Sequence, residues 1–546
     1  MTRTPAGTAT PETPDTPHAS EAPDTPETQD TQDTQDTPVR EDTAAAEGPS
    51  VRRFGAVLAL ARFEARELLF TIQILFFFCL EAGLVVLKLL STDGMDDYPV
   101  LNTVDRGTQT APVLFAIAVL VCTNAAALRS RKNGTDQLFD VTAMEPWRRT
   151  AAHVLSVVPY AALAAVMVAV EHLWAALKPG AIGHGSIGEL AVGPLTVLLA
   201  GVTGVLLARL LPYAFAPILF VIAFYVVMTA AAAAGAGGTG WGWLSPIVFD
   251  EDGGGDPAPS YLLGRPAAWH AVYLLGLVAL VICAALLFSG GRTRAVKAAA
   301  ALALATTAAG AIGQLPHDTA ALEAARKTAS RTPEKVQSCT EYGGSKYCSF
   351  PEWSGVRREW SGVVDRVQSL AGGTAATMPL TVRQRIDVVD GVETDTYVEP
   401  VSTPGQVTVG TRWGGNRVPE FAVGVASVLV AGKEDVALDD LCRDARMVTI
   451  MWLVLGADPT PTDTFQNVRL NDSTAGADLV LDPTNPLEMS AAQTTVVREL
   501  LNRPRAEVTA RVKEHWTELT SSATTPAQAA RLLGVKAPKE AATCDE

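Results

Sequence analysis

The residues of this chain that could transmit force to or from a partner gather in one polar block between two apolar segments. The block runs from Arg129 to Arg149, with basic residues at both of its ends and Pro146 near its close. A rigid, charged, amphipathic turn between two membrane segments can transmit a push from a motor protein, and Pro146 fixes the turn. The same charges also fit a basic anchor that holds the loop on one side of a membrane and has no partner.

No pattern for catalysis accompanies this block. The sequence has no Gly-x-x-x-x-Gly-Lys-Ser/Thr phosphate loop, and the glycine-rich run at 235–240 lacks the lysine. His317 and His515 are the only histidines of the C-terminal part, which therefore has no His-Glu-x-x-His zinc helix, and it has no nucleophile elbow. We expect a protein that is not an enzyme and that carries no cofactor or metal. Any ATP hydrolysis would come from another polypeptide.

The composition requires a membrane region to position the block. Hydrophobic residues make up 48% of the 546 residues and charged residues only 18%, and the mean hydropathy of +0.19 is too apolar for one ordinary soluble domain. Much of the net charge of -15 lies in residues 1–50 and in the C-terminal part. The net charge therefore says little about partners, and we expect no nucleic acid among them.

Seven apolar segments are candidates for crossing a membrane, because a hydrocarbon core of about 30 Å takes about 20 helical residues. They lie at 69–90, 111–128, 150–177, 190–210, 214–234, 268–287 and 296–312. The last is dominated by alanine, so its insertion depends on length and neighbours more than on hydrophobicity. The predicted fold class is a polytopic α-helical membrane protein, with six or seven spans in a domain at 51–315.

Basic residues indicate the direction of the spans, because lysine and arginine are retained on the cytoplasmic side. They precede the first span, fill the 129–149 block, end the fourth span at Arg209 and lie between the last two spans at 292–297. The alternate loops are acidic or neutral. We therefore predict a multi-pass protein of the cell membrane with a cytoplasmic N-terminus. Seven spans would put the chain after residue 315 outside the cytoplasm.

The two regions that flank the spans differ in kind. Residues 1–50 repeat Thr-Pro-Asp/Glu and Thr-Gln-Asp units without an aromatic residue, which predicts a disordered cytoplasmic tail. Residues 316–546 are long enough for a core of their own and are predicted to form an extracytoplasmic α+β domain. The expected strands lie at 381–389 and 406–410, and the expected helices at 320–327, 495–500 and 506–519.

Two short patterns in the C-terminal part carry further predictions. The repeat Glu-Trp-Ser-Gly-Val sets Trp353 and Trp360 on one helical face, which is more typical of core packing than of a ligand platform. Cys339 and Cys348, with two glycines between them, are close enough to close a hairpin by a disulfide in an oxidising compartment. The alternative is two free thiols in a cytoplasmic domain, which becomes the better one if the seventh segment does not cross.

One carboxylate lies in the middle of a predicted span, whereas Glu171, near the outer end of the third span, is expected to belong to an interfacial belt. Glu81 is in the middle of the first span, where an ionised carboxylate costs at least about 2.5 kcal/mol and should face protein or water. Glu81 is therefore a candidate for lining a pathway or for pairing with another span. The alternative is a protonated or hydrogen-bonded structural glutamate between helices.

In its order and position the polar block resembles the cytoplasmic loop of ABC-2 type permeases, the membrane subunits of ATP-driven transporters. A helix at 52–68, whose residues Phe54, Val57, Ala61 and Leu68 share one face, is similar to the connecting helix of that family. The resemblance covers about residues 51–287. It implies that the residues coupling the chain to an ABC ATPase are Arg131, Lys132, Gly134, Thr135, Leu138, Glu145, Pro146, Arg148 and Arg149.

The sequence thus leaves two hypotheses of different classes. The first is a permease subunit of an ABC transporter, paired with itself or with a sister permease in the lipid membrane and coupled to a separate ATPase through residues 129–149. The second is a membrane-anchored protein whose spans present residues 316–546 outside the cell for binding or sensing. A membrane enzyme is a weaker third option, because no catalytic constellation is present.

Overall fold

A computed structural model describes most of the chain. The described residues are 49–90, 97–134, 144–235, 244–246, 257–264, 266–315, 319–389, 398, 400–434, 444–468, 477–481 and 484–539. The predicted disordered tail, apart from its last two residues, and the predicted coupling residues Thr135 and Leu138 lie outside them. Residues 53–546 form one compact unit.

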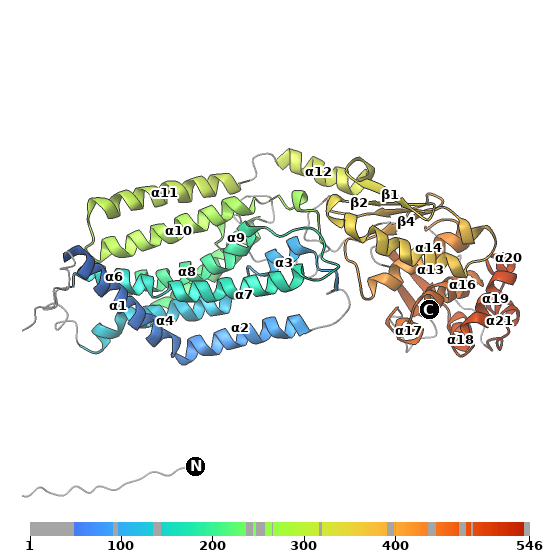
Figure 1. Cartoon of the computed structure of the whole chain (residues 1–546), viewed down its shortest axis with the longest axis horizontal. Coiled ribbons are helices and arrows are strands. Elements are labelled where there is room, and N and C mark those ends of the chain that lie inside the picture. The colour runs from blue at the N-terminus through green and yellow to red at the C-terminus, as the bar shows by residue number, and fades with distance from the viewer. Residues whose placement is uncertain are drawn as a thin grey trace, which may run out of the picture. The chain divides into compact units, whose positions relative to one another are not determined.

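The first part of this unit is a bundle of helices (Figure 1). Its helices are α1 (Pro49–Leu69), α2 (Ile72–Leu90), α3 (Leu101–Gly107), α4 (Val113–Lys132), α6 (Pro146–Leu155), α7 (Val158–Ala176), α8 (Ile187–Leu210), α9 (Ala216–Gly235), α10 (Ala267–Phe288) and α11 (Arg294–Gln314). Six stretches of the described chain are long and apolar enough to cross a membrane: α2, α4, α6 with α7, α8, α10 and α11. The prediction of a polytopic helical protein is confirmed at this level.

The fifth predicted segment, 214–234, corresponds to α9, and the alanine-rich seventh, 296–312, corresponds to α11, one of the six. The part of α9 whose side chains are all described is an apolar stretch, Ala216–Val227, that is shorter than a membrane span, so α9 is not one of the six. A side chain at Gly188 of α8 would nevertheless lie 2.8 Å from the backbone of Ala267 and Ala268, so α8 and α10 begin at the same end of the bundle. After the end of α8 the chain must therefore run back along the bundle before α10 can begin. The 20 residues of α9 form this connection.

The helix ends fall into two groups that we name by what they carry. At the basic end, Thr150 Oγ1 donates to Ser289 Oγ at 2.7 Å, and Arg129 lies 3.9 Å from Glu64. At the domain end, Val100 and Ile182 form a parallel β-bridge. The basic end gathers most of the cationic residues that flank the helices: Arg62, Arg66, Arg129, Arg131, Lys132, Arg148, Arg149, Arg209, Arg292, Arg294 and Lys297.

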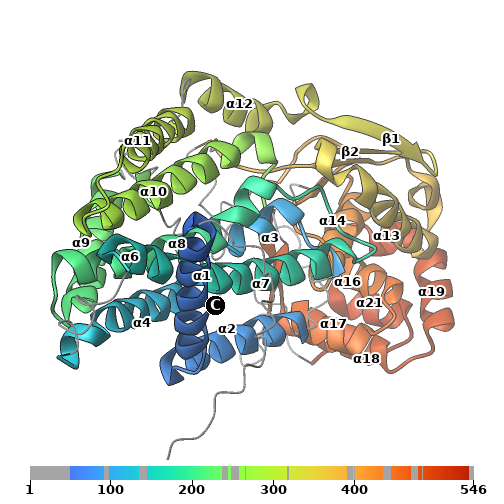
Figure 2. The ribbon, with the colours of Figure 1, turned by 60° about the vertical axis from the view of Figure 1, so that its left-hand side comes forward.

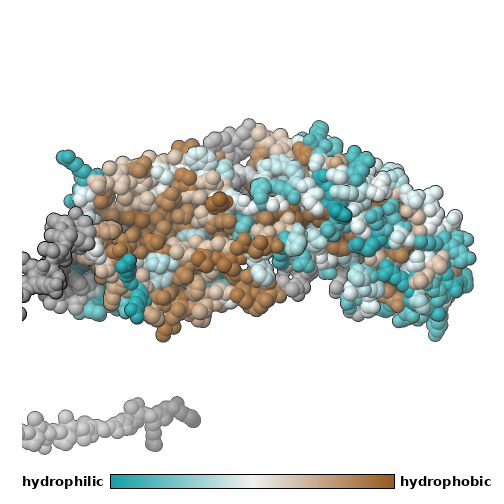
Figure 3. Space-filling view, in the orientation of Figure 1, coloured by the Kyte–Doolittle hydropathy of each residue, from teal (hydrophilic) through white to brown (hydrophobic). Residues whose placement is uncertain are grey.

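The bundle presents large apolar side chains on its outer surface, as the brown area of Figure 3 shows. Leu87 of α2 is 66% exposed and Leu302 of α11 is 69% exposed. Apolar surface on this scale is unfavourable in water but not against lipid tails. The surface therefore agrees with a multi-pass membrane protein.

The second part is a C-terminal domain of helices and a small sheet. Its helices are α12 (Thr319–Arg331), α13 (Arg357–Leu370), α14 (Arg417–Ala431), α16 (Arg446–Ala457), α17 (Pro461–Val468), α18 (Ala491–Leu501), α19 (Arg505–Glu514), α20 (Trp516–Leu519) and α21 (Pro526–Leu532). The sheet has the order β1 (Ser338–Tyr342), β2 (Ser345–Ser349), β3 (Thr381–Gln384) and β4 (Gln406–Val409). β1 and β2 are antiparallel, and the other two pairs are parallel. A separate hairpin joins β5 (Ala477–Leu481) and β6 (Thr484–Met489).

Some local predictions for this domain need correction. The strand expected at 381–389 ends at Gln384, because residues 385–389 pair with no strand beyond one hydrogen bond from Arg385 N to Val409 O. Trp353 lies in a 3-10 helix, Pro351–Val356, whereas Trp360 lies in α13, so the two do not share one helix. Both side chains are 0% exposed in the domain core, in agreement with a packing role.

The C-terminal domain packs on the loops of the domain end. Its hydrophobic core includes Val100, Ile182 and Leu262 from those loops. The Glu352 carboxylate accepts hydrogen bonds from the backbone N of Ser260 at 3.0 Å and from its Oγ at 2.5 Å. These contacts place the C-terminal domain at the end of the bundle opposite the basic end.

Candidate functional site

α1 is the element that organises the basic end. Its buried residues Val57, Ala61, Glu64 and Leu68 recur every three or four positions and form one stripe. Val57 and Ala61 pack on Ala152 of α6. The helix crosses the bundle helices instead of running along them (Figure 2). Phe54, which the sequence places on the same face as these residues, is 67% exposed and belongs to the outer side of α1.

Long ion pairs tie α1 to the start of the polar block. Arg129, at the end of α4, lies 3.9 Å from both Glu64 and Glu67. Glu64 also lies 4.0 Å from Nδ1 of His153 in α6. Burial raises the pKa of Glu64, and the positive charge of Arg129 opposes that rise. The carboxylate therefore links three helices through contacts longer than hydrogen bonds.

The described coupling residues occupy the two ends of the block. Arg131, Lys132 and Gly134 are exposed at the end of α4, where Gly134 has φ of 67°, a left-handed conformation that ends a helix at little cost to glycine. Thr135 and Leu138 lie outside the described residues, so the predicted coupling element is described only in part.

The far end of the block begins a helix. Pro146 is the first residue of α6, where its missing N–H removes no helical hydrogen bond. It therefore begins a helix as well as ending the turn before it. Arg148 Nε lies 3.0 Å from the Glu145 carboxylate, which also accepts from Trp147 Nε1 at 2.7 Å. The Arg148 guanidinium stacks 5.2 Å from the centre of the Trp147 ring. Glu145, Trp147 and Arg148 thus form a compact charged corner.

A break in the helix separates this corner from the membrane core. α6 ends at Leu155 and α7 begins at Val158, although together they form one apolar stretch of 31 residues, Pro146–Ala176. Pro159, in the first turn of α7, lacks the N–H that a continuous helix would need at that position. Tyr160 Oη donates to the carbonyl of Ala65 at 2.5 Å and so connects the break to α1.

The predicted intramembrane carboxylate is buried. Glu81 is 4% exposed, so it faces protein, as its cost in lipid requires. Near Glu81 the structure also has an ion pair that the sequence did not indicate. Lys88 Nζ of α2 lies 2.6 Å from the carboxylate of Glu171 in α7. Glu171 was expected in an interfacial belt, but it is 4% exposed. The two acids are electrostatically coupled across α2 and α7.

A groove lies between α7, α8 and α10. It encloses about 580 Å³ and is lined by apolar side chains that include Val168, Leu190, Pro194 and Leu275. A lining of this kind offers no hydrogen-bonding group for a polar solute. The groove therefore fits hydrocarbon and gives no support to a path for a hydrophilic substrate.

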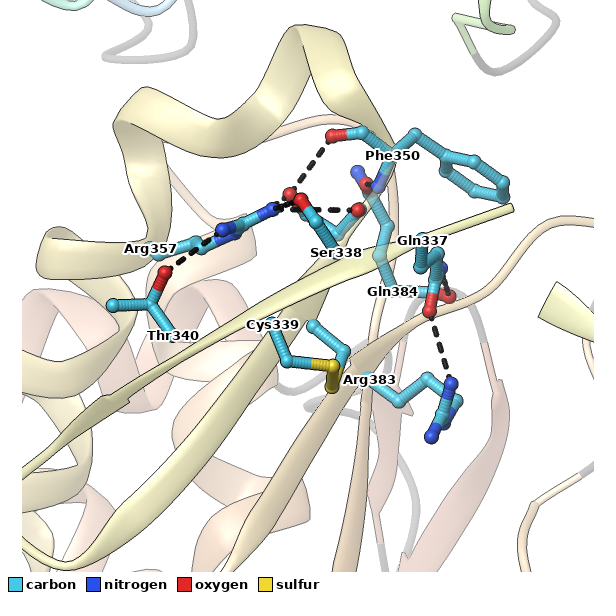
Figure 4. Close-up of a disulfide and its surroundings, with 10 residues drawn as sticks. Gln337, Ser338, Cys339, Thr340, Phe350, Arg357, Arg383 and Gln384 are labelled. Atoms are coloured by element: carbon cyan, nitrogen blue, oxygen red, sulfur yellow. Dashed lines mark hydrogen bonds between the residues drawn. A yellow bond between two sulfur atoms is a disulfide. The ribbon is translucent and has the colours of Figure 1, made fainter. Parts of the chain in front are cut away.

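The predicted disulfide joins β1 and β2 in the C-terminal domain. Cys339 and Cys348 are direct partners in the strand register and are bonded to each other. Beside them the buried Arg357 donates to Ser349 Oγ at 2.9 Å, to Thr340 Oγ1 at 2.9 Å and to Ser338 Oγ at 2.5 Å (Figure 4). The hydroxyls that flank the two cysteines thus hold the guanidinium, and the disulfide keeps both strands in place around it.

Among the described residues no group of three His, Cys, Asp or Glu side chains is arranged to hold a metal ion. Comparisons of the chain with protein-family models, with curated proteins and with solved structures find no match. The arguments for function therefore come from the residues themselves.

Proposed function

We propose that this chain is the membrane-spanning permease subunit of an ATP-driven ABC transporter and that a separate ATPase binds residues 129–149. The observation that carries the proposal is the joint anchoring of the two ends of this block at the basic end. Arg129, at its start, pairs with Glu64 and Glu67 of α1. α6, which begins at Pro146, packs on the same helix through Ala152. A push on the block would therefore act on α1, α4 and α6 together.

The charge distribution supports a cytoplasmic basic end. Most of the cationic residues that flank the bundle helices gather there, and lysine and arginine are retained on the cytoplasmic side of cell membranes. The Cys339–Cys348 disulfide in the domain at the opposite end fits an oxidising compartment. In the proposed orientation the N-terminus is cytoplasmic and the C-terminal domain lies outside the cell.

The helix break offers a route from the block to the bundle. A force on the charged corner at Glu145–Arg148 would tilt α6, and the break before Pro159 would let α6 move with respect to α7. α7 contacts α2 through the Lys88–Glu171 pair, so the movement would reach the first span. In ABC transporters of this architecture two permease copies, identical or sister subunits, would enclose the path.

The test is the strength of the link between the block and an ATPase. The affinity-tagged full chain is purified in detergent from its native membranes, and bound ATPase activity is measured for wild type, for the double variant Arg148→Glu/Arg149→Glu and for the control Arg292→Glu/Arg294→Glu. Arg292 and Arg294 are exposed at the same end but outside the block, which makes them a matched control. We expect ATPase activity to remain with the control and to be lost from the first variant. Equal retention by both variants, or its absence from wild type, would overturn the proposal.

A membrane-anchored binding or sensing protein is the second candidate. It is favoured by one observation: among the described residues the largest hydrophobic core belongs to the C-terminal domain and extends into the domain-end loops. This hypothesis predicts that the response of the cell to the ligand is unchanged when residues 129–149 are scrambled. The same response should be lost when the chain is truncated at residue 316. The permease reading predicts that scrambling the block abolishes transport.

A further inference from the structure

Several polar side chains are buried together at the domain end, on α3, in the turn that follows it and at the start of α8. Asp105 is 1% exposed, Gln109 is 3% exposed and Glu189 is 8% exposed. This cluster lies outside the block to which the proposed function assigns coupling, and the inference drawn from it does not depend on an ATPase. A polar group buried to this extent needs a partner.

Hydrogen bonds hold the cluster together. The Oδ2 atom of Asp105 accepts from the backbone N of Ser186 at 2.6 Å, at the residue that caps the N-terminus of α8. Gln109 Nε2 donates to Glu189 Oε2 in the first turn of the same helix. Two carboxylates thus converge on one helix start. Burial, with a contribution from the Glu189 charge, raises the pKa of Asp105 to about 7, while Arg106 and the hydrogen bond from Ser186 lower it.

Capping of α8 explains only part of this arrangement. A carboxylate at a helix N-terminus is favourable, and that accounts for Oδ2 of Asp105. The other oxygen, Oδ1, is buried without a hydrogen-bond partner, and so is Oε1 of Gln109. Because Gln109 Nε2 donates to Glu189, its amide points into the cluster and Oε1 lies there too.

A third oxygen lies on the same face. Asn102 precedes Asp105 by three positions and Gln109 follows it by four, so their side chains leave one side of α3 and its continuation. Asn102 Nδ2 donates to the carbonyl of Ala258 at 2.9 Å, which leaves its buried Oδ1 without a partner. The cluster therefore offers carboxylate and amide oxygens and no sulfur or nitrogen ligand.

We propose that Asp105, Glu189 and Gln109, with Asn102 beside them, bind a divalent cation of the Ca²⁺ type. Hard cations prefer oxygen ligands, and Ca²⁺ accepts carboxylates together with amide oxygens and waters in an irregular shell. Two carboxylates balance two positive charges, which removes the repulsion between them. Among the described residues Arg106 is the positive side chain that acts on Asp105, and its charge opposes the binding of a cation there.

A bound cation would fix the domain end. Residues 97–102, which lead into α3, contact the C-terminal domain through Tyr98, whose ring centre lies 6.5 Å from that of Trp413. Glu189 belongs to α8, a central bundle helix. The cation would therefore join the helix that starts there to the loop that holds the C-terminal domain.

The experiment measures Ca²⁺ binding to the detergent-purified full chain after treatment with a chelator. Calorimetric titration and the thermal unfolding midpoint are recorded with Ca²⁺, Mg²⁺ and Na⁺ for wild type, Asp105→Asn, Glu189→Gln and Gln109→Leu. The control is Asp97→Asn, an exposed acid just before α3. We expect Ca²⁺ to raise the midpoint of wild type and of the control, and to bind the three cluster variants at least about tenfold more weakly.

Three outcomes would overturn the proposal. One is a wild-type chain that no divalent cation stabilises, a result that needs no variant to fold. Another is unchanged Ca²⁺ affinity in Asp105→Asn and Glu189→Gln. The third is a wild-type midpoint that ignores Ca²⁺ but rises as the pH falls through 7, with loss of that rise in Asp105→Asn, because the two acids would then share a proton and no metal ion.

Discussion

The two ends of the bundle are built differently. At the basic end the charged links between α1 and its neighbours are ion pairs of 3.9 Å from Arg129 to Glu64 and Glu67, beside a small apolar contact with Ala152 and one hydrogen bond from Tyr160. At the domain end the links are hydrogen bonds of 2.5 and 3.0 Å from Ser260 to Glu352 and a continuous hydrophobic core. Long, partly solvated ion pairs add little stability, whereas core packing adds much. The difference indicates one end that can be moved and one that is held.

The largest expected effect lies in the core of the C-terminal domain. Trp353 is 0% exposed, and its Nε1 donates to the carbonyl of Thr411 at 2.8 Å. Trp353→Ala should lower the free energy of unfolding by about 3–5 kcal/mol, because it leaves a cavity and an unpaired carbonyl. Scanning fluorimetry of the purified chain measures the shift. The control Trp174→Ala removes a ring that is 51% exposed. A comparable loss of stability in this control would mean that the effect of Trp353→Ala does not come from its burial in the core.

The disulfide should give the next largest effect. The double variant Cys339→Ser/Cys348→Ser removes a cross-link that closes a short loop, and loop-closure entropy predicts a loss of about 2–3 kcal/mol. Reductant should lower the unfolding midpoint of wild type to that of the variant and leave the variant unchanged. A further drop in the unfolding midpoint of the variant on adding reductant would show that another disulfide contributes to stability.

Labelling of the same two cysteines also checks the proposed side of the domain. In intact cells a membrane-impermeant maleimide should label Cys339 and Cys348 only after an external reductant, because both are oxidised outside the cytoplasm. Labelling that requires permeabilised cells would place the C-terminal domain inside and reverse the proposed orientation.

The buried carboxylate of Glu434 should make the stability of the C-terminal domain depend on pH. It accepts hydrogen bonds from Thr408 N at 2.8 Å and Thr408 Oγ1 at 2.6 Å, yet burial raises its pKa above the ordinary 4.5. The folded state then holds the proton more tightly than the unfolded state. The resulting stability is fully present below pH 4.5 and is lost as the pH rises through the raised pKa. Glu434→Gln cannot titrate, so its unfolding midpoint should change less with pH than that of wild type over this window.

The contact between the bundle and the C-terminal domain should contribute less. Glu352→Ala removes the acceptor of two hydrogen bonds from Ser260 and should cost about 1–2 kcal/mol. Limited proteolysis near residue 260 reports the local loosening. Glu359→Ala removes an exposed acid in the first turn of α13 and should leave the cleavage rate unchanged. Equal cleavage in both variants would mean that packing alone holds the interface.

The sequence predicted the features that depend on neighbours along the chain. Apolar runs indicated the spans, and the spacing of Cys339 and Cys348 indicated the hairpin, because both follow from local periodicity and loop length. The predicted apolar face of α1 was nearly right, but Phe54 was assigned to the wrong side of the helix, because apolar residues face lipid as readily as protein. Local patterns do not say which apolar neighbour a side chain meets.

Features that depend on distant partners escaped prediction. Lys88 pairs with Glu171 across 83 positions, and Gln109 meets Glu189 across 80, so no local pattern connects them. α14 and α16 were missed for another reason: nearly every residue of these short apolar helices is buried, which removes the amphipathic period that marks a surface helix. A continuous apolar run such as 447–457 was the one available signal.

The smallest effect on stability should come from the basic end, where the effect on activity should be the largest. Arg129→Ala removes two ion pairs of 3.9 Å to Glu64 and Glu67 and should change the free energy of unfolding by less than about 1 kcal/mol. In the proposed complex it should nevertheless uncouple ATP hydrolysis from transport, because the start of the block would lose its hold on α1. The matched variant is Arg326→Ala at the domain end, whose Nε donates to the carbonyl of Leu262 at 3.0 Å. It should lower stability more and leave coupling intact. If Arg129→Ala destabilised the chain as much as Arg326→Ala and left coupling unchanged, the basic end would be a structural anchor and the division between a moving end and a held end would be wrong.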